Sequence, residues 1–323
     1  MNNNITILNT LNANTTNTNR ANRQPTWAVI GQDVSSCANV DSVLSTAGIG
    51  YGVEKRPIYV PGRNGIMNPV AGQMATYEPD TDTTLGIVSE KYEIVPSSRA
   101  FAFMDNIEGI KFVTAGRTYN GMDYIIGELT EFEVLGDKFT LFVIAQNSYN
   151  GRFDIKATIC PLRIVCQNQF SGAFRKSENV VSIRHSSLFD IRATALDTLA
   201  AEANSVNALN DFANSCVNAK VSASDVESVI KYLFPLSEGI KERQRDNIMA
   251  KRHAFRAAYD MDDNANFRGT VWGLVNAYTD YTTHATMRNS KDMGKQSDRQ
   301  FMSVTFDTNM LMYMVNMANA LAH

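Results

Sequence analysis

Cationic side chains gather in the middle of the chain, where a strand pattern gives way to a helix pattern, and they could contact the phosphates of a nucleic acid. Between residues 149 and 192, seven cations exceed three acids, and Tyr149 and Phe170 lie among them. Positive charge along a strand, with aromatic rings on which bases stack, binds single-stranded nucleic acid without sequence preference. We expect these contacts to come from Arg152, Lys156, Arg163, Asn168, Arg175, Lys176 and Arg184.

Asn168 has a further expected role, because it precedes a segment that can form a helix. Its side chain would accept backbone N–H bonds at the helix N-terminus, a place that also attracts phosphate. A second basic surface is expected on a long helix further along, from Arg245, Lys251, Arg252 and Arg256. For each cluster the alternative interpretation is a solvated charged face.

One pair of residues could support nucleophilic chemistry. Cys166 lies near the end of the stretch ATICPLRIVCQNQF, and His185 follows further along the chain. A reactive thiolate needs a nearby base or cation, and His185 is the only such residue close in sequence. The residues around Cys166 resemble a strand end, where cysteine behaves as a small apolar residue. We therefore expect Cys166 to be structural and predict no catalytic residue.

Metal and cofactor motifs are absent from the sequence. The four cysteines and four histidines show no zinc-knuckle spacing and no His-Glu-x-x-His. Neither GxxxxGK[ST] nor GxGxxG follows a strand pattern, which argues against a kinase, an ATPase or a dinucleotide enzyme. We predict no metal, no cofactor and no nucleotide hydrolysis.

Composition indicates an ordinary globular protein. The chain has 323 residues, of which 44% are hydrophobic and 20% charged, and its net charge is −3, so any basic surface must be local. Four cysteines in so long a chain fit reduced thiols and a cytoplasmic location in the host cell. No apolar run approaches the roughly 18 residues of a membrane span. Residues 1–24 are rich in Asn and Thr and are expected to form a disordered tail.

The N-terminal elements that position these residues are less regular. We expect a short helix over 39–49, capped by Asp41 or Ser42 and ended by Gly48. A strand over 51–60, a turn-rich loop over 61–69, a strand pair or bent strand over 85–95 and a helix over 96–107 follow.

Residues 111–160 carry the clearest pattern, four strands joined by turns at Asn120-Gly121, Gly136-Asp137 and Asn150-Gly151. An Asn-Gly pair between alternating apolar runs is a strong hairpin signal, so we predict an antiparallel meander. The third strand is apolar on both faces and should be central. The fourth should bury one face and leave the other wet, and Pro161 should introduce a jog near its end.

Beyond residue 187 the period becomes helical, after a short strand over 179–186. Ser224 or Asp225 is expected to cap one helix, and a stripe including Trp272 predicts another over 269–287. The fold class is therefore α+β, an antiparallel β-meander with flanking helices and a mainly helical C-terminal part. The expected regions are the tail at 1–24, an α+β core at 25–187 and a helical region at 188–323.

Several segments, in order, resemble the family of phage- and plasmid-borne proteins grouped as a large domain of unknown function. They are Trp27 with Ile30-Gly31, then YEIVPSSRAFAFMD, GRTYNG, QNSYNGRFDIKAT, PLRIVCQNQF, IRHS and RGTVWGLVNAYTDYTTH, spread over roughly residues 25–290. The resemblance implies a mobile-element origin and intracellular action, and it implies no chemistry. A meander followed by a helix with basic residues at the junction is also similar to phage single-strand annealing proteins, which work as rings or filaments.

Three functions remain open. The leading hypothesis is a phage or plasmid protein that binds single-stranded DNA, with strand annealing in recombination or replication, as a homo-oligomer and without a membrane. The second is a protein-interaction module, such as an inhibitor of a host defence system, with a host protein as its partner. The third is an enzyme, supported only by the Cys166 and His185 pair.

Overall fold

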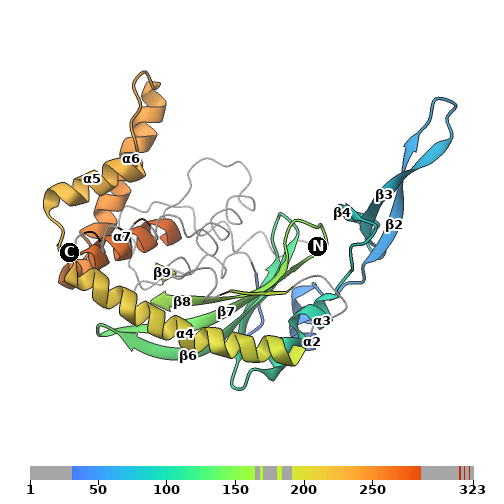
Figure 1. The fold of residues 1–323 in the computed structure, drawn as a ribbon, viewed down its shortest axis with the longest axis horizontal. Helices are drawn as coiled ribbons and strands as arrows, with labels where there is room; N and C mark the ends of the chain where they lie inside the picture. Colours follow the sequence, from blue (N-terminus) through green and yellow to red (C-terminus); the bar gives the residue numbers. More distant parts are fainter. Residues whose placement is uncertain are drawn as a thin grey trace.

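An antiparallel sheet with the strand order β1-β5-β6-β7-β8-β10 lies at the centre of the protein (Figure 1). The computed structural model describes residues 31–163, 168–169, 180–183 and 191–284, with single helical positions at 313, 316 and 320. Strands dominate the first half and helices the second, which confirms the predicted α+β class. The strands of this sheet are β1 (Gln32–Asp33), β5 (Lys111–Arg117), β6 (Met122–Val134), β7 (Asp137–Ser148), β8 (Ile155–Arg163) and β10 (Val180–Ile183), and β9 (Asn168–Gln169) pairs with β8.

The predicted meander is formed by β5 to β8, each strand antiparallel to the next. The turn between β6 and β7 consists of Leu135 and Gly136, whose φ angles are 51° and 85°. Positive φ at both central positions is what a two-residue turn of type I′ requires. Asp137 already pairs with Val134, so the prediction of a turn at Gly136-Asp137 is wrong by one residue.

The interior strand β7 is buried from Phe139 to Ser148, which confirms its predicted central place. In β8, the predicted buried face is confirmed by Ile155, which is fully buried. The opposite face is only partly wet, because Lys156 on it is one-third exposed and Thr158 is 2% exposed. The prediction of a wet face is wrong from Thr158 onward, because the second face of the sheet carries its own apolar cluster there.

Pro161 causes no jog in β8. It pairs in register with Leu141 of β7, and the register does not shift on either side of it. On the other side of β8, the pairing with β10 ends at Thr158 and that with β9 begins at Leu162. The missing N–H of Pro161 therefore falls between two short partner strands, where it interrupts no ladder bond.

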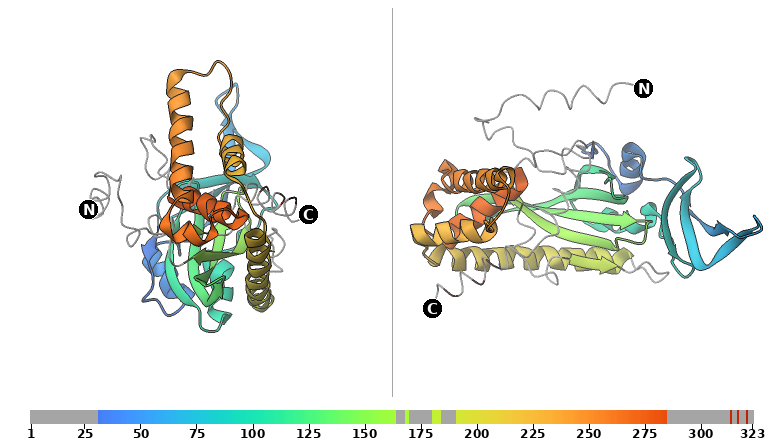
Figure 2. Two further views of the ribbon diagram at one scale, coloured as in Figure 1. Left: turned by 90° about the vertical axis from the view of Figure 1, so that its left-hand side faces the viewer. Right: turned by 90° about the horizontal axis from the view of Figure 1, so that it is seen from above.

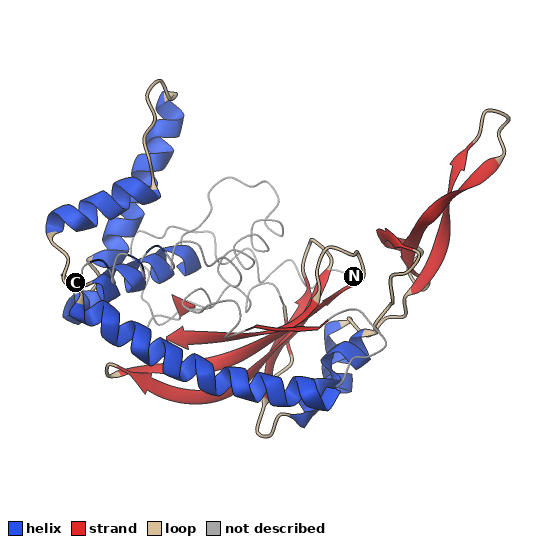
Figure 3. Ribbon diagram, in the orientation of Figure 1, coloured by secondary structure: helices blue, strands red, loops and turns tan. Residues whose placement is uncertain are grey.

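Helices cover one face of the sheet (Figure 3). The long helix α4 (Ile191–Asn218) follows β10 and contacts β6, β8 and β10. Three shorter helices add to the same core: α2 (Val40–Ala47), α3 (Ser97–Phe101) and the 3₁₀ helix η2 (Ala102–Asn106). Phe101, Met104 and Ile107 are buried there, as the helix predicted over 96–107 requires.

A second core holds the C-terminal helices together. They are α5 (Ala223–Leu233), α6 (Glu242–Tyr259), the 3₁₀ helix η4 (Asp262–Phe267) and α7 (Val271–His284). Trp272 is fully buried at its centre, and the ring centroids of Phe212 and Phe267 lie 6.0 and 6.5 Å from its own. Val134 and Phe139, at the β6–β7 turn, belong to the same core. The helical end therefore packs on the tip of the meander.

Two helices begin with capping boxes that lie slightly upstream of the predicted caps. The N-cap of α2 is Asn39, and Ser42 closes the box from the N3 position. The N-cap of α5 is Ser222, and Asp225 is its N3 partner. In each case the predicted capping residue takes part, but from inside the first turn. Gly48 ends α2 in the left-handed conformation, as expected.

A separate three-stranded sheet projects beyond the meander, at the end of the molecule opposite the C-terminal helices (Figures 1 and 2). Its strands are β2 (Glu54–Pro61), β3 (Met67–Glu78) and β4 (Thr83–Ser89). The predicted loop over 61–69 is confirmed at 62–66, which join β2 to β3, whereas its outer residues belong to the two strands, and the strand or strand pair predicted over 85–95 ends at Ser89. Pro61 and Pro69 lie in strands because proline is tolerated in a ribbon whose outer edges are unpaired.

Candidate functional site

The predicted basic junction is only partly described. Arg152 is exposed in the β7–β8 loop, where its backbone N–H donates to the Asn150 side chain over 2.9 Å. Lys156 is one-third exposed, and its Nζ lies 3.7 Å from the Asp154 carboxylate. The backbone of Arg163 pairs with that of Asn168. Outside the described residues lie Arg175, Lys176 and Arg184, as do Cys166 and His185.

Asn168 does not cap a helix. It lies in β9, and the next residue, Gln169, is also in that strand. The first residue after an N-cap must be helical, so the predicted cap is wrong at this position. β9 pairs antiparallel with the end of β8, a long-range pairing that a helix-start signal does not reveal.

The second basic surface is divided between structural cations and solvated ones. Arg252 donates from Nε and Nη2 to the Phe234 carbonyl over 3.0 and 2.8 Å. Arg256 forms an ion pair with Glu227 of α5. These two cations therefore fasten α6 to α5 and its C-terminus rather than facing solvent.

The first half of α6 is exposed apart from the half-buried Ile248, and it projects from the helical end (Figure 1). Residues 241–256 carry six cations and two acids, in a chain whose net charge is −3. The exposed cations are Lys241, at the N-cap of the helix, and Arg243, Arg245 and Lys251 within it. A polar helix without an apolar stripe gains little from packing, so its surface is available to solvent or to a polyanion.

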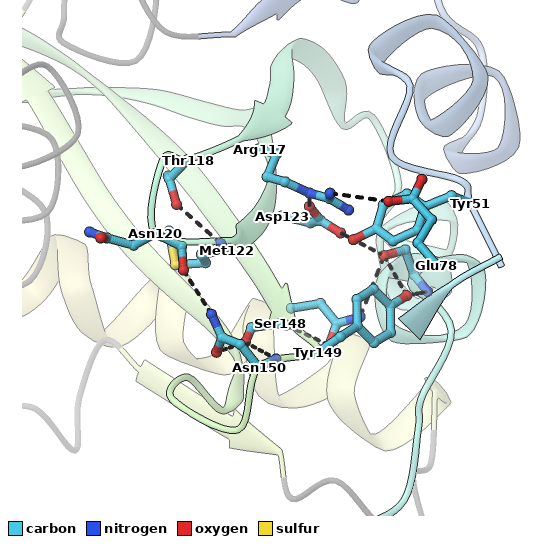
Figure 4. Close-up of polar contacts among 12 residues, drawn as sticks. Tyr51, Glu78, Arg117, Thr118, Asn120, Met122, Asp123, Ser148, Tyr149 and Asn150 are labelled. Carbon is cyan, nitrogen blue, oxygen red and sulfur yellow. Dashed lines mark hydrogen bonds and ion pairs between the residues drawn. The ribbon is translucent and has the colours of Figure 1, made fainter. Parts of the chain in front are cut away.

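A buried polar cluster, which we call the polar joint, connects the small sheet to the meander (Figure 4). At its centre the Asp123 side chain is fully buried and accepts from Arg117 Nε over 2.7 Å. Arg117 Nη1 lies 3.7 Å from Glu78 on β3. One guanidinium therefore holds carboxylates from two different sheets.

Two tyrosines complete the polar joint. The Tyr51 hydroxyl donates to Asp123 Oδ2 over 2.6 Å, and the Arg117 guanidinium lies 3.9 Å from the centre of the Tyr51 ring. Tyr149 accepts the backbone N–H of Ser97 over 2.7 Å and receives the Tyr51 ring edge-on at 5.6 Å. These contacts bring β6, β7 and the start of α3 together with the segment that precedes β2.

The electrostatics of the polar joint follow from its burial. Loss of hydration raises the pKa of Asp123 to about 6, and the adjacent Arg117 charge opposes this shift without cancelling it. Burial likewise raises the pKa of Tyr149 to about 12, so its phenol is neutral near pH 7. Ser97, at 2% exposure, contacts these groups, but a substrate could reach it only if the joint opened. Most of these groups bond to one another, although Arg117 Nη2 is buried without a hydrogen-bond partner among the described residues, and this mutual bonding favours a positioning role.

The small sheet also meets the meander through one close backbone approach. Thr76 of β3 donates its hydroxyl to the Tyr149 carbonyl over 2.7 Å. A Cβ placed on Gly86 would lie 2.5 Å from the Cα of Asn150. Only glycine permits this contact, because a neighbouring backbone cannot rotate out of the way as a side chain can.

We therefore expect Gly86→Ala to loosen the small sheet from the meander, at a cost of about 1–3 kcal/mol for overpacking. Hydrogen exchange should accelerate in β3 and β4 and stay unchanged in β6 and β7. Gly52→Ala is the matched control, since a Cβ there meets nothing within 4 Å. Equal exchange in the two variants would show that the contact at Asn150 does not hold the sheets together.

Sequence reasoning did not single out the polar joint as a site, although signals for it are visible. Asp123 begins the apolar strand MDYIIG, and its cross-strand partner Asn147 ends the apolar strand FTLFVIAQNS. A carboxylate and an amide at paired strand positions beside buried residues require polar partners. The partners Tyr51 and Glu78 are remote in sequence, which hides the cluster from local patterns.

The remaining reactive groups give no sign of a metal centre. No group of three His, Cys, Asp or Glu side chains in the described part of the chain could hold a metal ion. Cys160 and Cys216 are buried and form no disulfide, and burial raises the pKa of the Cys216 thiol to about 12. None of the described helices is both long and apolar enough to cross a membrane.

The fold and the site define an α+β protein, built on an antiparallel meander with a polar joint at one end and a cationic helix at the other. The chain belongs to the family described as a domain of unknown function, DUF932, whose model matches residues 84–304. The predicted membership in an uncharacterised domain family is confirmed, and the match begins at β4 rather than near residue 25. No protein of curated function and no solved structure matches the chain.

Proposed function

We propose that this protein binds single-stranded DNA in the cytoplasm of a cell that carries a phage or plasmid, and that it anneals complementary strands without nucleotide hydrolysis. The observation that carries the proposal is the exposed cationic surface of α6 and its N-cap, where Lys241, Arg243, Arg245 and Lys251 outnumber the acids Glu242 and Asp246. A phosphate backbone binds such a surface by releasing its condensed counterions, and no base-specific contact is needed.

The position of the DNA differs from the analogy with annealing proteins. Those proteins hold DNA between the meander and the following helix, whereas α4 packs directly on the sheet through residues such as Val206. The proposed path therefore follows α6, with Arg152 and Lys156 at the other end of the sheet as additional contacts. Arg252 and Arg256 position the helix rather than touching phosphate.

The test is fluorescence anisotropy with a labelled oligonucleotide, single- and double-stranded, over a range of salt concentrations. We expect Arg243→Glu/Arg245→Glu to weaken binding. The slope of log affinity against log salt should fall by about 1.4 for a single strand, since each phosphate that is no longer neutralised lowers it by about 0.7. Annealing of the complementary strand, followed in the same cuvette, should slow in parallel.

The matched control is Lys91→Glu/Lys138→Glu, which changes the net charge equally at exposed positions outside α6. It should leave the affinity and the salt slope close to wild type. An equal loss of affinity in the two double variants would show that binding depends on overall charge and not on α6. No binding of the wild type at low salt would exclude nucleic acid as a partner.

A second candidate function is a protein-interaction module, such as an inhibitor of a host defence system. Exposed apolar side chains on the small sheet favour it, with Tyr59 at 50% and Ile66 at 60% exposure. An apolar interface depends little on salt, whereas phosphate binding weakens steeply. Retention of one stoichiometric host protein at high salt, abolished by Tyr59→Ser, would favour this function over DNA binding.

A further inference from the structure

The outer half of the small sheet, residues 58–72, is a two-stranded ribbon that we call the arm. β4 pairs with β3 only from Gln73 onward, so in the arm β2 and β3 have no other strand partner among the described residues. The arm extends away from the rest of the described chain (Figures 1 and 2). An isolated two-stranded ribbon is only marginally stable in water, which points to a partner that covers it.

Both faces of the arm carry exposed apolar side chains. Cross-strand partners share a face, so Tyr59 and Pro69 lie beside Pro61 and Met67 on one face. Tyr59 is 50% and Met67 54% exposed. On the other face Ile66 is 60% exposed. Large apolar side chains clustered on one projection mark an interaction site rather than scattered surface residues.

A proline weakens each edge of the arm as a site for strand addition. Gly62 donates its backbone N–H to the Ile66 carbonyl, so Pro61 and Met67 form the next pair, whose backbone groups point outward. By the same alternation Pro69 faces outward from β3, opposite Tyr59. A proline has no N–H to offer a further strand, so each edge lacks one of its outward donors. These edges favour a partner that packs on a face of the arm over one that extends its sheet.

The opposite end of the molecule offers a surface of matching character. Leu236 in the α5–α6 loop and Met249 on α6 are exposed by 38 and 37%, and Tyr232 on α5, which is 57% exposed, stacks on Tyr313 with ring centroids 4.2 Å apart. One pair of charges is also complementary. Arg63 is the only charged residue of the arm, and Glu238 is the only acid of the loop 234–241. Both residues are exposed.

We propose that the arm of one copy packs against the α5–α6 end of a second copy. The two surfaces differ and lie at opposite ends of the molecule, so the contact is head-to-tail and repeats from copy to copy (Figure 1). Apolar residues of the arm cover those of the α5–α6 end, and Arg63 lies near Glu238 of the neighbour. This contact needs no DNA, and its residue on α6, Met249, differs from the cations of that helix that are proposed to bind DNA.

Sedimentation velocity on nucleic-acid-free protein tests the contact over a range of concentrations. An arm variant, Tyr59→Ser/Met67→Ser, and an end variant, Leu236→Ser/Met249→Ser, should each abolish the concentration-dependent rise in sedimentation coefficient. Mixed together they should form a one-to-one dimer and nothing larger, because each retains one intact half of the contact. The control Ile87→Ser/Leu135→Ser removes two other exposed apolar side chains and should associate as wild type does.

Charge exchange supplies a second readout that misfolding cannot imitate. Arg63→Glu and Glu238→Arg should each weaken association, and the combined variant should recover it. A wild-type protein that stays monomeric at its highest soluble concentration would overturn the proposal. Association that survives in the arm variant, or a mixture that stays monomeric, would overturn it as well.

Discussion

Replacing Arg117 by methionine should be among the most destabilising single changes in the protein, lowering the free energy of unfolding at pH 8 by about 3–5 kcal/mol. Asp123 is fully buried and accepts from Arg117 over 2.7 Å, and Glu78 is 9% exposed beside it. Removing the guanidinium leaves two carboxylates near each other without a counter-charge. Urea denaturation followed by circular dichroism measures the loss.

Arg56→Met is the matched control, because Arg56 has the same kinds of partner at an exposed place. Its guanidinium lies 3.6 Å from the Tyr77 ring centre and 3.5 Å from the Glu54 carboxylate. The two charged side chains are 49 and 58% exposed, so the pair contributes about 0–1 kcal/mol. A similar loss in both variants would mean that burial does not set the strength of the Arg117 contacts.

The meander could be read from the sequence because its signals are local. Strand alternation and glycine turns are written within 111–160, and β7 is apolar on both faces because both faces are covered. Even there the turn type was not fully readable. At Asn120-Gly121 only Gly121 has positive φ, and the type I′ pattern occurs instead at Leu135 and Gly136.

The small sheet could be read only in part from local patterns. The strand predicted over 51–60 and the turn at Asn64-Gly65 are present, but Pro61 and Pro69, which favour turns in most contexts, occupy outward positions of a ribbon here. Which positions face outward depends on the pairing register, and residue types do not show it. The extension of β3 to Glu78 is fixed by contacts with β4 and with Tyr149, far along the chain.

The candidate sites also combine features that the sequence shows with features that only tertiary contacts decide. The cationic content of α6 is visible in the sequence, but its split into solvated and structural cations is not. Arg252 and Arg256 are indistinguishable from Arg245 by type and spacing, and the Phe234 carbonyl and Glu227 decide their roles. Charge patterns predict where cations gather, while tertiary contacts decide which of them remain available to a partner.

The second large effect is a pH dependence that belongs to Asp123 alone. Burial raises the pKa of Asp123 from 3.8 to about 6 in the folded protein. Between these values the folded state keeps a proton that the unfolded chain has released. Its contribution to stability is therefore complete below pH 3.8, declines as the pH rises to about 6, and changes little above that.

Comparison with Asp123→Asn isolates this contribution, because the amide keeps the shape of the side chain and does not titrate. We expect the difference in unfolding free energy, wild type minus variant, to fall by about 3 kcal/mol between about pH 4 and pH 7. Urea denaturation of both proteins at each pH measures it, and the other carboxyl groups cancel in the difference.

The direction of the slope decides which force governs the polar joint. If the Arg117 charge and the Tyr51 hydrogen bond outweighed burial, the folded state would favour the carboxylate, and the difference would rise with pH instead of falling. In that case Asp123 would still be ionised at pH 5, and Arg117→Met would lower the free energy of unfolding there as much as it does at pH 8. A falling difference, with a smaller cost of Arg117→Met at pH 5 than at pH 8, would establish burial as the dominant force.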